Sequence, residues 1–232
     1  MANQPANILL RTPMFRMSYP NLVEARAYQD PRSGRKGDPE FSTDMLLTPD
    51  ALDEFEGRRD DEWEKINVKN AMAEVAKAEW PDINLRDAVQ NGGLKWPLVD
   101  GNTKKQQQEA KGKKGDVYEN MKVIPVKAKE GYPPALFVLD QGKFRELGRT
   151  NEQDMARAKD LFVGGHYAKG SLNLKAMQTP QGRFLVFYVN AVLFVKEGER
   201  IGGMSPEERF GGIEGGASSH DPTEGLDDEI PF

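Results

Sequence analysis

The chain has 232 residues and a mass of 26.0 kDa, with 38% hydrophobic and 30% charged residues, which fits one large domain with long polar segments. It contains no cysteine, so disulfides and thiolate metal sites are excluded, and no apolar run approaches the ~20 residues that span a membrane. The net charge of −5 is unevenly distributed: residues 201–232 carry eight acidic side chains and one Arg, a net −7, which leaves +2 on residues 1–200.

Two alternating segments near the N-terminus predict β-strands. In residues 14–19, Phe15, Met17 and Tyr19 share one face, and in residues 41–47 the shared face carries Phe41, Thr43, Met45 and Leu47. Between these segments, residues 30–39 are rich in Gly, Pro and basic side chains, which predicts a loop. The first ten residues lack a basic region of the kind that opens a secretory signal.

Residues 49–80 are expected to form a helix. Thr48 is the predicted N-cap, Pro49 occupies the first helical position, and Gly57 bends or interrupts the helix. The apolar stripe consists of Leu52, Phe55, Trp63 and Ile66. Seven acidic residues lie between positions 53 and 64; helical periodicity favours a solvated face over a set of metal ligands.

The middle of the chain is basic. Residues 104–129 contain eight Lys against three acidic side chains, a net +5, and residues 100–116 are predicted to be a mobile loop. Residues 118–129 predict a strand with Ile124, Val126 and Ala128 facing inward, and residues 136–144 predict a hairpin that turns at Gln141-Gly142. Thr150 and Gln153 form a candidate capping box for a helix over 151–162, which Gly164-Gly165 ends.

Two long strands are predicted before the C-terminal segment. In residues 167–177, one face carries Ala168, Leu172, Leu174 and Ala176, and residues 179–182 then form a turn. Residues 184–195 are almost continuously apolar, which predicts a strand buried on both faces. After residue 198 the apolar pattern ends, and residues 211–219 are expected to be a flexible linker. We therefore expect a domain over 1–198 and a flexible acidic tail over 199–232.

The sequence carries no positive sign of an enzyme. His166 and His220 form no convincing metal or triad constellation, and His166 is most simply a residue at the start of a strand. The phosphate-binding, dinucleotide-binding and zinc-protease motifs are all absent from the sequence. No cofactor or metal is expected. A Mg²⁺-dependent nuclease that uses only carboxylates stays open, because its ligands need no local spacing.

The outward face of residues 167–177 is the best candidate for a binding site. It carries one ring, two cations and two hydrogen-bonding side chains, namely Tyr167, Lys169, Ser171, Asn173 and Lys175. On such a platform the bases of a single strand stack on rings while Lys neutralises phosphates; an ordinary solvated strand face is the alternative. Neighbouring rings and cations recur in other segments and extend the candidate DNA-binding set to Lys127, Lys129, Tyr132, Phe144, Arg145 and Trp96.

The chain ends in an acidic and then apolar tip. Its residues are Asp227, Asp228, Glu229, Ile230, Pro231 and Phe232. The ring fits an apolar pocket of a partner, and the terminal carboxylate suits an Arg or Lys at its rim. A frayed, solvated end is the alternative. The tip resembles that of bacterial single-stranded DNA-binding proteins, usually Asp-Asp-Asp-Ile-Pro-Phe, from which Glu229 alone departs.

Several longer segments resemble a family of phage single-stranded DNA-binding proteins. They are residues 14–21, residues 39–47, the late strand pair and residues 200–210, and the likeness covers nearly all of 10–232. The resemblance implies an OB fold, a five-stranded and partly open barrel, here mainly β with added helices and a helical insertion near 49–80. The tetramer of the bacterial proteins is not carried over, and a homo-oligomer is left open.

The resemblance also implies a function in the cytoplasm of an infected bacterial host. The protein would bind and protect single-stranded DNA, with little sequence preference, during phage replication and recombination. It would recruit host or phage replication proteins through its tip. An adaptor that acts only through the tail, and the Mg²⁺-dependent nuclease, remain the alternatives.

Overall fold

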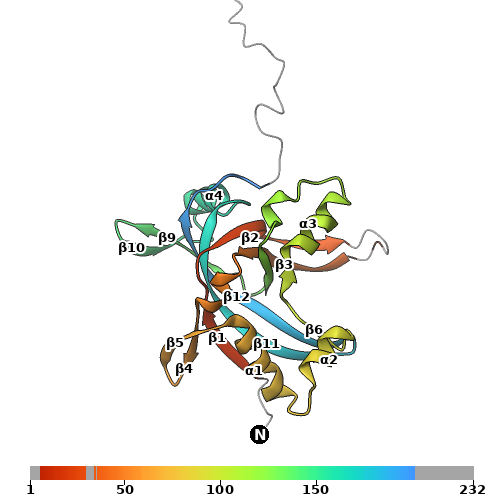
Figure 1. Cartoon of the computed structure of the whole chain (residues 1–232). Coiled ribbons are helices and arrows are strands. Elements are labelled where there is room, and N and C mark those ends of the chain that lie inside the picture. Colours follow the sequence, from red (N-terminus) through yellow and green to blue (C-terminus); the bar gives the residue numbers. More distant parts are fainter. Residues whose placement is uncertain (1–5, 30–33, 35, 202–232) are drawn as a thin grey trace, which may run out of the picture. The chain divides into compact units, whose positions relative to one another are not determined.

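The computed structural model describes residues 6–29, 34 and 36–201, and the chain divides into two units, Met1–Ile201 and Gly202–Phe232. The linker and the tip discussed above lie outside the described residues. The described part is mainly β with added helices, as expected (Figure 1). The strands are β1 (Asn7–Arg11), β2 (Phe15–Gln29), β3 (Lys36–Leu47), β4 (Phe55–Arg59), β5 (Glu62–Ile66), β6 (Leu94–Lys95), β7 (Val99–Asp100), β8 (Lys122–Lys129), β9 (Ala135–Asp140), β10 (Lys143–Glu146), β11 (Tyr167–Thr179) and β12 (Gly182–Lys196). The α-helices are α1 (Val68–Glu79), α2 (Leu85–Gln90), α3 (Gly101–Glu109) and α4 (Glu152–Leu161); η1 (Asp50–Asp53) and η2 (Asp116–Tyr118) are 3-10 helices.

Five strands close a ring at the centre of the sheet. β12 pairs with β8, β8 with β3, β3 with β2 and β2 with β11, and β11 returns to β12. The alternation expected near the N-terminus is confirmed for Phe15 and Met17, which are buried. It fails at Tyr19, which is 47% exposed, because a positive φ there and a register shift after Ser18 turn the strand. Ser18 is buried instead, and its hydroxyl lies 2.7 Å from the Tyr118 hydroxyl.

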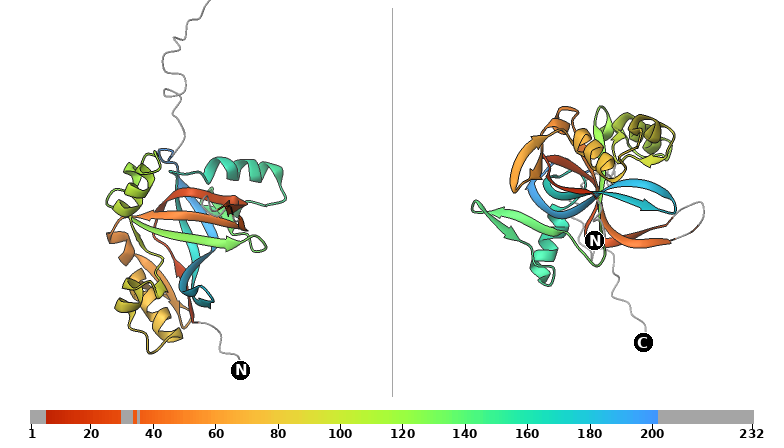
Figure 2. Two further views of the ribbon diagram at one scale, coloured as in Figure 1. Left: turned by 90° about the vertical axis from the view of Figure 1, so that its right-hand side faces the viewer. Right: turned by 90° about the horizontal axis from the view of Figure 1, so that it is seen from below.

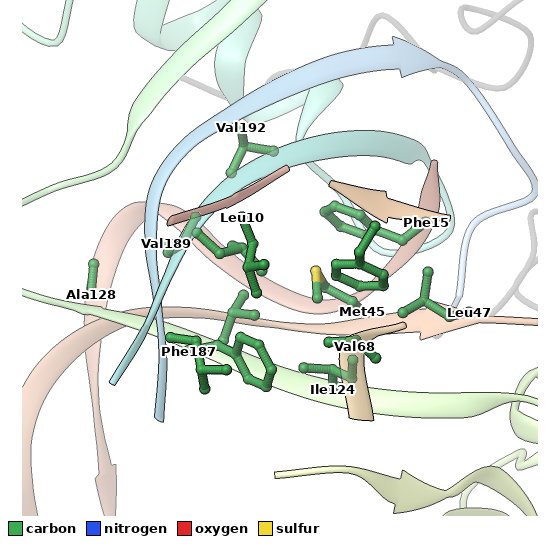
Figure 3. Close-up of a cluster of buried hydrophobic side chains, with 14 of the residues drawn as sticks. Leu10, Phe15, Met45, Leu47, Val68, Ile124, Ala128, Phe187, Val189 and Val192 are labelled. Carbon is green, nitrogen blue, oxygen red and sulfur yellow. The ribbon is translucent and has the colours of Figure 1, made fainter. Parts of the chain in front are cut away.

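One hydrophobic core fills the ring (Figure 3). Inward-facing side chains of the strands meet there, including Phe15, Met45, Ile124 and Phe187. The apolar stripe of α1 joins the same core through Val68, Ala71, Met72, Val75 and Ala76. Each large side chain buried in this way contributes about 1.5–3 kcal/mol. The core therefore fixes the positions of the ring strands and of the side chains on their outer faces.

Two hairpins extend the sheet beyond the ring. β1 pairs with β11, β4 with β1 and β5 with β4, while β9 pairs with β12 and β10 with β9. Each hairpin turns on two residues with positive φ, Asp60-Asp61 in one and Gln141-Gly142 in the other. Positive φ at both positions matches the right-handed twist of the strands. The hairpin and the turn expected at Gln141-Gly142 are confirmed, and both hairpins project from one side of the ring (Figures 1 and 2).

The helix expected over 49–80 is wrong for its first half. Thr48 is not an α-helical N-cap; the chain makes η1, then the hairpin β4–β5, and α1 begins only after Asn67. The Asn67 side chain caps α1 by accepting from the backbone N–H of Lys69 at 2.8 Å. Residues 62–66 do not alternate apolar and polar side chains, and Trp63 and Ile66 lie on opposite faces of β5, so residue-by-residue pairing with β4 prevails over the helical spacing of Phe55, Trp63 and Ile66. Gly57 is a strand residue whose open Cβ position faces Ile8 at 3.1 Å.

The basic segment 100–116 was expected to be a loop, and this is wrong for residues 101–109, whereas residues 110–115 form neither helix nor strand. Residues 101–109 form α3, and the Asp100 side chain caps it by accepting from the N–H of Asn102 at 3.0 Å. The helix has no apolar stripe, so periodicity does not reveal it. Its position is set by packing instead: a Cβ on Gly101 would lie 2.1 Å from the Tyr118 carbonyl oxygen, and Lys105 pairs with Glu119 at 2.9 Å.

The helix and the two long strands expected after residue 150 are confirmed in outline. α4 lies where a helix was expected, but Asn151 caps it rather than Thr150, through N–H groups at 2.9 and 3.1 Å. β11 buries Ala168, Leu172, Leu174 and Ala176 in strict alternation, and β11 and β12 flank the expected turn. β12 is not buried on both faces, because Val186, Tyr188 and Leu193 on its outer face stay partly exposed.

Candidate nucleic-acid interface

The outer face of β11 is continuous with the outer faces of its neighbours. Residues directly opposite each other in antiparallel strands share a face, so the pairing registers define rows across the sheet. One row, from the β4–β5 hairpin to β9, runs Lys65, Glu56, Arg11, Ser171, Ala191 and Ala135. A second row runs Lys169, Leu193, Phe137 and Glu146, and Leu139 and Phe144 lie beyond it on the same face.

These rows form the floor and walls of an open groove of about 1080 Å³. Lys169, Ser171 and Leu193 lie on its floor, while the β9–β10 hairpin contributes Phe137 and Phe144 to one wall. β1 and the β4–β5 hairpin supply the other wall, and the two hairpins stand on either side of β11 and β12 (Figure 2). The remaining lining residues are Arg11, Thr12, Pro13, Met14, Glu54, Glu56, Lys65, Gly170, Ala191 and Val195.

Rings and cations lie together along this groove. The Arg11 guanidinium stacks on Trp63 with its carbon 3.8 Å from the ring centroid, and it pairs with Glu56 at 3.7 Å. Stacking and pairing hold the guanidinium in place on the wall, where its unused N–H groups can donate to a phosphate. Phe144 on the opposite wall is 72% exposed, which is unusual for a large apolar ring. An exposed ring facing a groove is a surface on which a base can stack.

The structure brings the five expected residues of β11 onto one face. Lys169 and Ser171 line the groove itself. Tyr167 lies beside it with its ring 4.8 Å from the Lys196 Nζ. Lys175 lies further along the strand, with its Nζ 5.9 Å from the centroid of the Tyr188 ring. The Asn173 Oδ1 atom is buried and has no hydrogen-bond partner among the described residues.

Lys127, Lys129 and Tyr132 lie on another part of the outer surface. Lys127 of β8 is opposite Tyr188, which places it beyond the far side of β12 from the groove lining. Its Nζ pairs with Glu40 at 2.7 Å. Lys129 is exposed and lies opposite Glu40 in the β3–β8 pairing, and Tyr132 just beyond β8 is 78% exposed. These residues form a separate basic surface that continues the face past Tyr188.

Arg145 and Trp96 are not brought to the groove. Arg145 alternates with Phe144, so it lies on the opposite face of β10, where it pairs with Asp154 at 2.9 Å and Asp140 at 3.7 Å. The N–H of Gly148 and the Arg145 guanidinium both lower the pKa of Asp154. Trp96 packs against the hydrophobic core. Neighbouring rings and cations in a sequence therefore do not always share a surface, because successive strand residues point to opposite faces.

Among the groove residues that the sequence did not reveal are Arg11, Lys65 and Phe137, and it did not reveal Trp63, on which Arg11 stacks. Trp63 and Lys65 fall within the expected helix, and residues 62–66 show no apolar–polar alternation that would have indicated a strand. Arg11 and Phe137 reach the groove only because β1 and β9 pair with the β11–β12 hairpin. Their position depends on the pairing of strands that are distant in sequence, which no local sequence pattern predicts.

The described residues give a structural role to His166. The side chain is buried, and its Nδ1 donates to the Leu161 carbonyl oxygen at 2.9 Å, so this nitrogen carries a proton. Among the described residues, no three His, Asp or Glu side chains cluster as metal ligands would. In the same part of the chain, none of the helices has the length and apolar character needed to cross a membrane.

A small ring of strands with an open face that carries rings and cations is typical of modules that bind single strands. A family model described as "Enterobacter phage Enc34, ssDNA-binding protein" matches residues 8–221. The chain therefore belongs to this family of phage single-stranded DNA-binding proteins, and the resemblance seen in the sequence is confirmed.

Solved structures show the same fold. The single-stranded DNA-binding protein of bacteriophage Enc34 in complex with ssDNA is similar with a TM-score of 0.53 and 15% identity, over 87% of this chain and 97% of that chain. The same phage protein without DNA gives 0.54 and 16%, over 89% and 94%. Its C-terminal truncation gives 0.55 and 15%, over 87% and 95%. No curated protein sequence matches the chain.

Proposed function

We propose that the protein binds single-stranded DNA across the groove between the β4–β5 and β9–β10 hairpins. The observation that carries this proposal is the joint placement of cations and rings in one open groove. Arg11, Lys65 and Lys169 neutralise phosphates, and bases stack on Phe144. Family membership supports the same function. Every nucleotide has a phosphate and a base that can stack, so sequence preference is weak.

The finer features of the function belong to the same proposal. The ring of five strands serves as the OB-type barrel, with the hairpins and helices as additions to it. Coating of single strands protects them during phage replication and recombination, in the cytoplasm of the infected host, without catalysis by the protein itself. Residues 1–198 act as the DNA-binding domain. The tail over 199–232 recruits replication proteins through Ile230, Pro231 and Phe232, because an apolar tip with a terminal carboxylate is a compact anchor.

A salt series tests the proposal. Fluorescence anisotropy with labelled oligo(dT) measures affinity between low and moderate salt. Each phosphate neutralised on a single strand contributes a slope of about −0.7 to the plot of log K against log[salt], so three groove cations give roughly −2. Absence of binding at low salt would leave only the adaptor function of the tail. Incubation of the oligonucleotide with the protein and Mg²⁺ tests the nuclease alternative, and intact DNA is the expected result.

A further inference from the structure

At the two ends of the main path of the sheet, β5 and β10 each have one edge unpaired among the described residues. β5 pairs only with β4, and β10 pairs only with β9. A free edge presents unpaired N–H and C=O groups to any strand of suitable shape. Both edges belong to the hairpins that flank the groove (Figures 1 and 2). A partner on either edge would therefore lie next to the DNA-binding surface.

The two edges carry opposite charges. On the face away from the groove, β5 presents Glu62 and Glu64, and β10 presents Lys143 and Arg145. Charges on edge strands usually prevent unwanted pairing. Here two β5 edges would place Glu against Glu, and two β10 edges would place cation against cation, which is unfavourable. β5 against β10 is the combination in which opposite charges meet.

The pattern of outward-pointing backbone N–H and C=O groups on the two edges also matches. Trp63 and Phe144 are each the second residue after a two-residue turn. In such hairpins the pair next to the turn exchanges hydrogen bonds, and the following pair does not. The N–H and C=O of Trp63 and Phe144 therefore point away from their own hairpins. Set antiparallel and opposite each other, these two residues can form a hydrogen-bonded pair.

Strand direction agrees with that arrangement. Along the path β10, β9, β12, β11, β1, β4 and β5, the pairing senses make β10 and β5 antiparallel to each other. If a second copy binds the DNA through the same groove and in the same orientation, its β10 edge thus lies antiparallel to the β5 edge of the first copy. The pairings of β1 and β9 with the ring hold the hairpins of one chain apart, so the two edges of one chain do not meet.

We propose that the β5 edge of one copy pairs antiparallel with the β10 edge of the next copy along a DNA strand. Trp63 lies opposite Phe144, Glu64 opposite Lys143 and Glu62 opposite Arg145. The two surfaces differ, so the contact is head-to-tail and propagates as an open array. This inference rests on the proposed DNA-binding function, since both grooves then lie on one side of the joined sheet.

The contact is short and depends on DNA for its formation. Arg145 is already held by Asp154 at 2.9 Å, so Lys143 and Glu64 form the adjustable pair. A few edge pairs do not hold two free proteins together. When two copies are bound to one DNA strand, the effective concentration of each copy at the other is on the order of millimolar, which is enough for a weak contact. The consequence is cooperative coating of long single strands.

Charge reversal and charge exchange test this pairing in the full-length protein. The variants are Lys143→Glu, Glu64→Lys and the double variant, with Lys77→Glu on the solvent-facing side of α1 as a control. Affinity is measured on an oligo(dT) that holds one protein, and cooperativity on long poly(dT). Each single reversal lowers the cooperativity parameter about fivefold, the upper range for one cross-strand pair. The double variant regains the wild-type value, and the control is unchanged.

The outcomes separate this inference from the proposed function. Failure of the wild-type protein to bind the short oligonucleotide contradicts the function, and the array with it. Wild-type binding without cooperativity on long DNA contradicts the array alone. The pairing is also wrong if single reversals leave cooperativity intact, or if the double variant is as defective as either single one. Reversals that change binding of one protein to the short oligonucleotide as much as they change cooperativity would place these side chains in the DNA contact rather than between copies, which overturns the proposal.

Discussion

The exposed ring of Phe144 offers the sharpest test of the groove. Phe144 is 72% exposed and lines the wall formed by the β9–β10 hairpin. Its replacement by Ala removes little buried surface, so we expect the free energy of unfolding to change by no more than about 0.5 kcal/mol. If a base stacks on the ring, its loss weakens binding by about 1–3 kcal/mol, which is roughly 5- to 150-fold in Kd.

Anisotropy with an oligo(dT) that holds one protein measures this effect. Tyr28→Ala is the matched control, because Tyr28 is also 72% exposed but lies at the far end of β2, outside the groove lining. We expect the control to bind like the wild-type protein. A folded Phe144→Ala variant whose Kd stays within about twofold of wild type would refute the assignment of this wall to base stacking.

Three further predictions concern charge, pH and the tip. Lys169→Ala should reduce the salt slope by about 0.7, one phosphate contact on a single strand, and an unchanged slope in a variant shown to be folded would place Lys169 outside the DNA path. Burial raises the pKa of Tyr118 to about 12, above its ordinary 10.0, so the neutral phenol is the form that folding favours. The free energy of unfolding should therefore fall as pH rises from 10 toward 12, and urea titrations should show a smaller fall for Tyr118→Phe; equal slopes for the two proteins would contradict this cause. Removal of residues 230–232 should leave DNA affinity within about twofold and abolish capture of replication proteins from host lysate, whereas retention of every partner would count against the tip.

The alternation of buried and outward side chains along individual β-strands could be predicted from the sequence. Residues 167–177 form one buried and one outward row because the side-chain period of a strand is two, whatever its neighbours are. The hairpin turn at Gln141-Gly142 was predictable because residues with positive φ at both turn positions are strongly selected. Family membership followed from segments scattered along the chain and agrees with the match over residues 8–221.

Local patterns were less informative where helix and strand signals compete or where tertiary packing positions a polar helix. Phe55, Trp63 and Ile66 also fit a helical stripe, so the sequence predicts a helix where the β4–β5 hairpin forms. α3 lacks an apolar stripe and owes its position to close packing of Gly101 against residues 118–121. In both segments, contacts between distant parts of the chain outweighed local preference.

The sequence by itself determined which residues of β11 face outward, and it placed basic and aromatic side chains among them. Only the tertiary structure decided which other segments join them. Arg11 and Phe137 enter the groove through strand pairing across long sequence separations, while Arg145 leaves it although it follows Phe144 directly. The physical reason is that a strand fixes the side from which each side chain projects, whereas its neighbours in the sheet are chosen by the packing of the whole core.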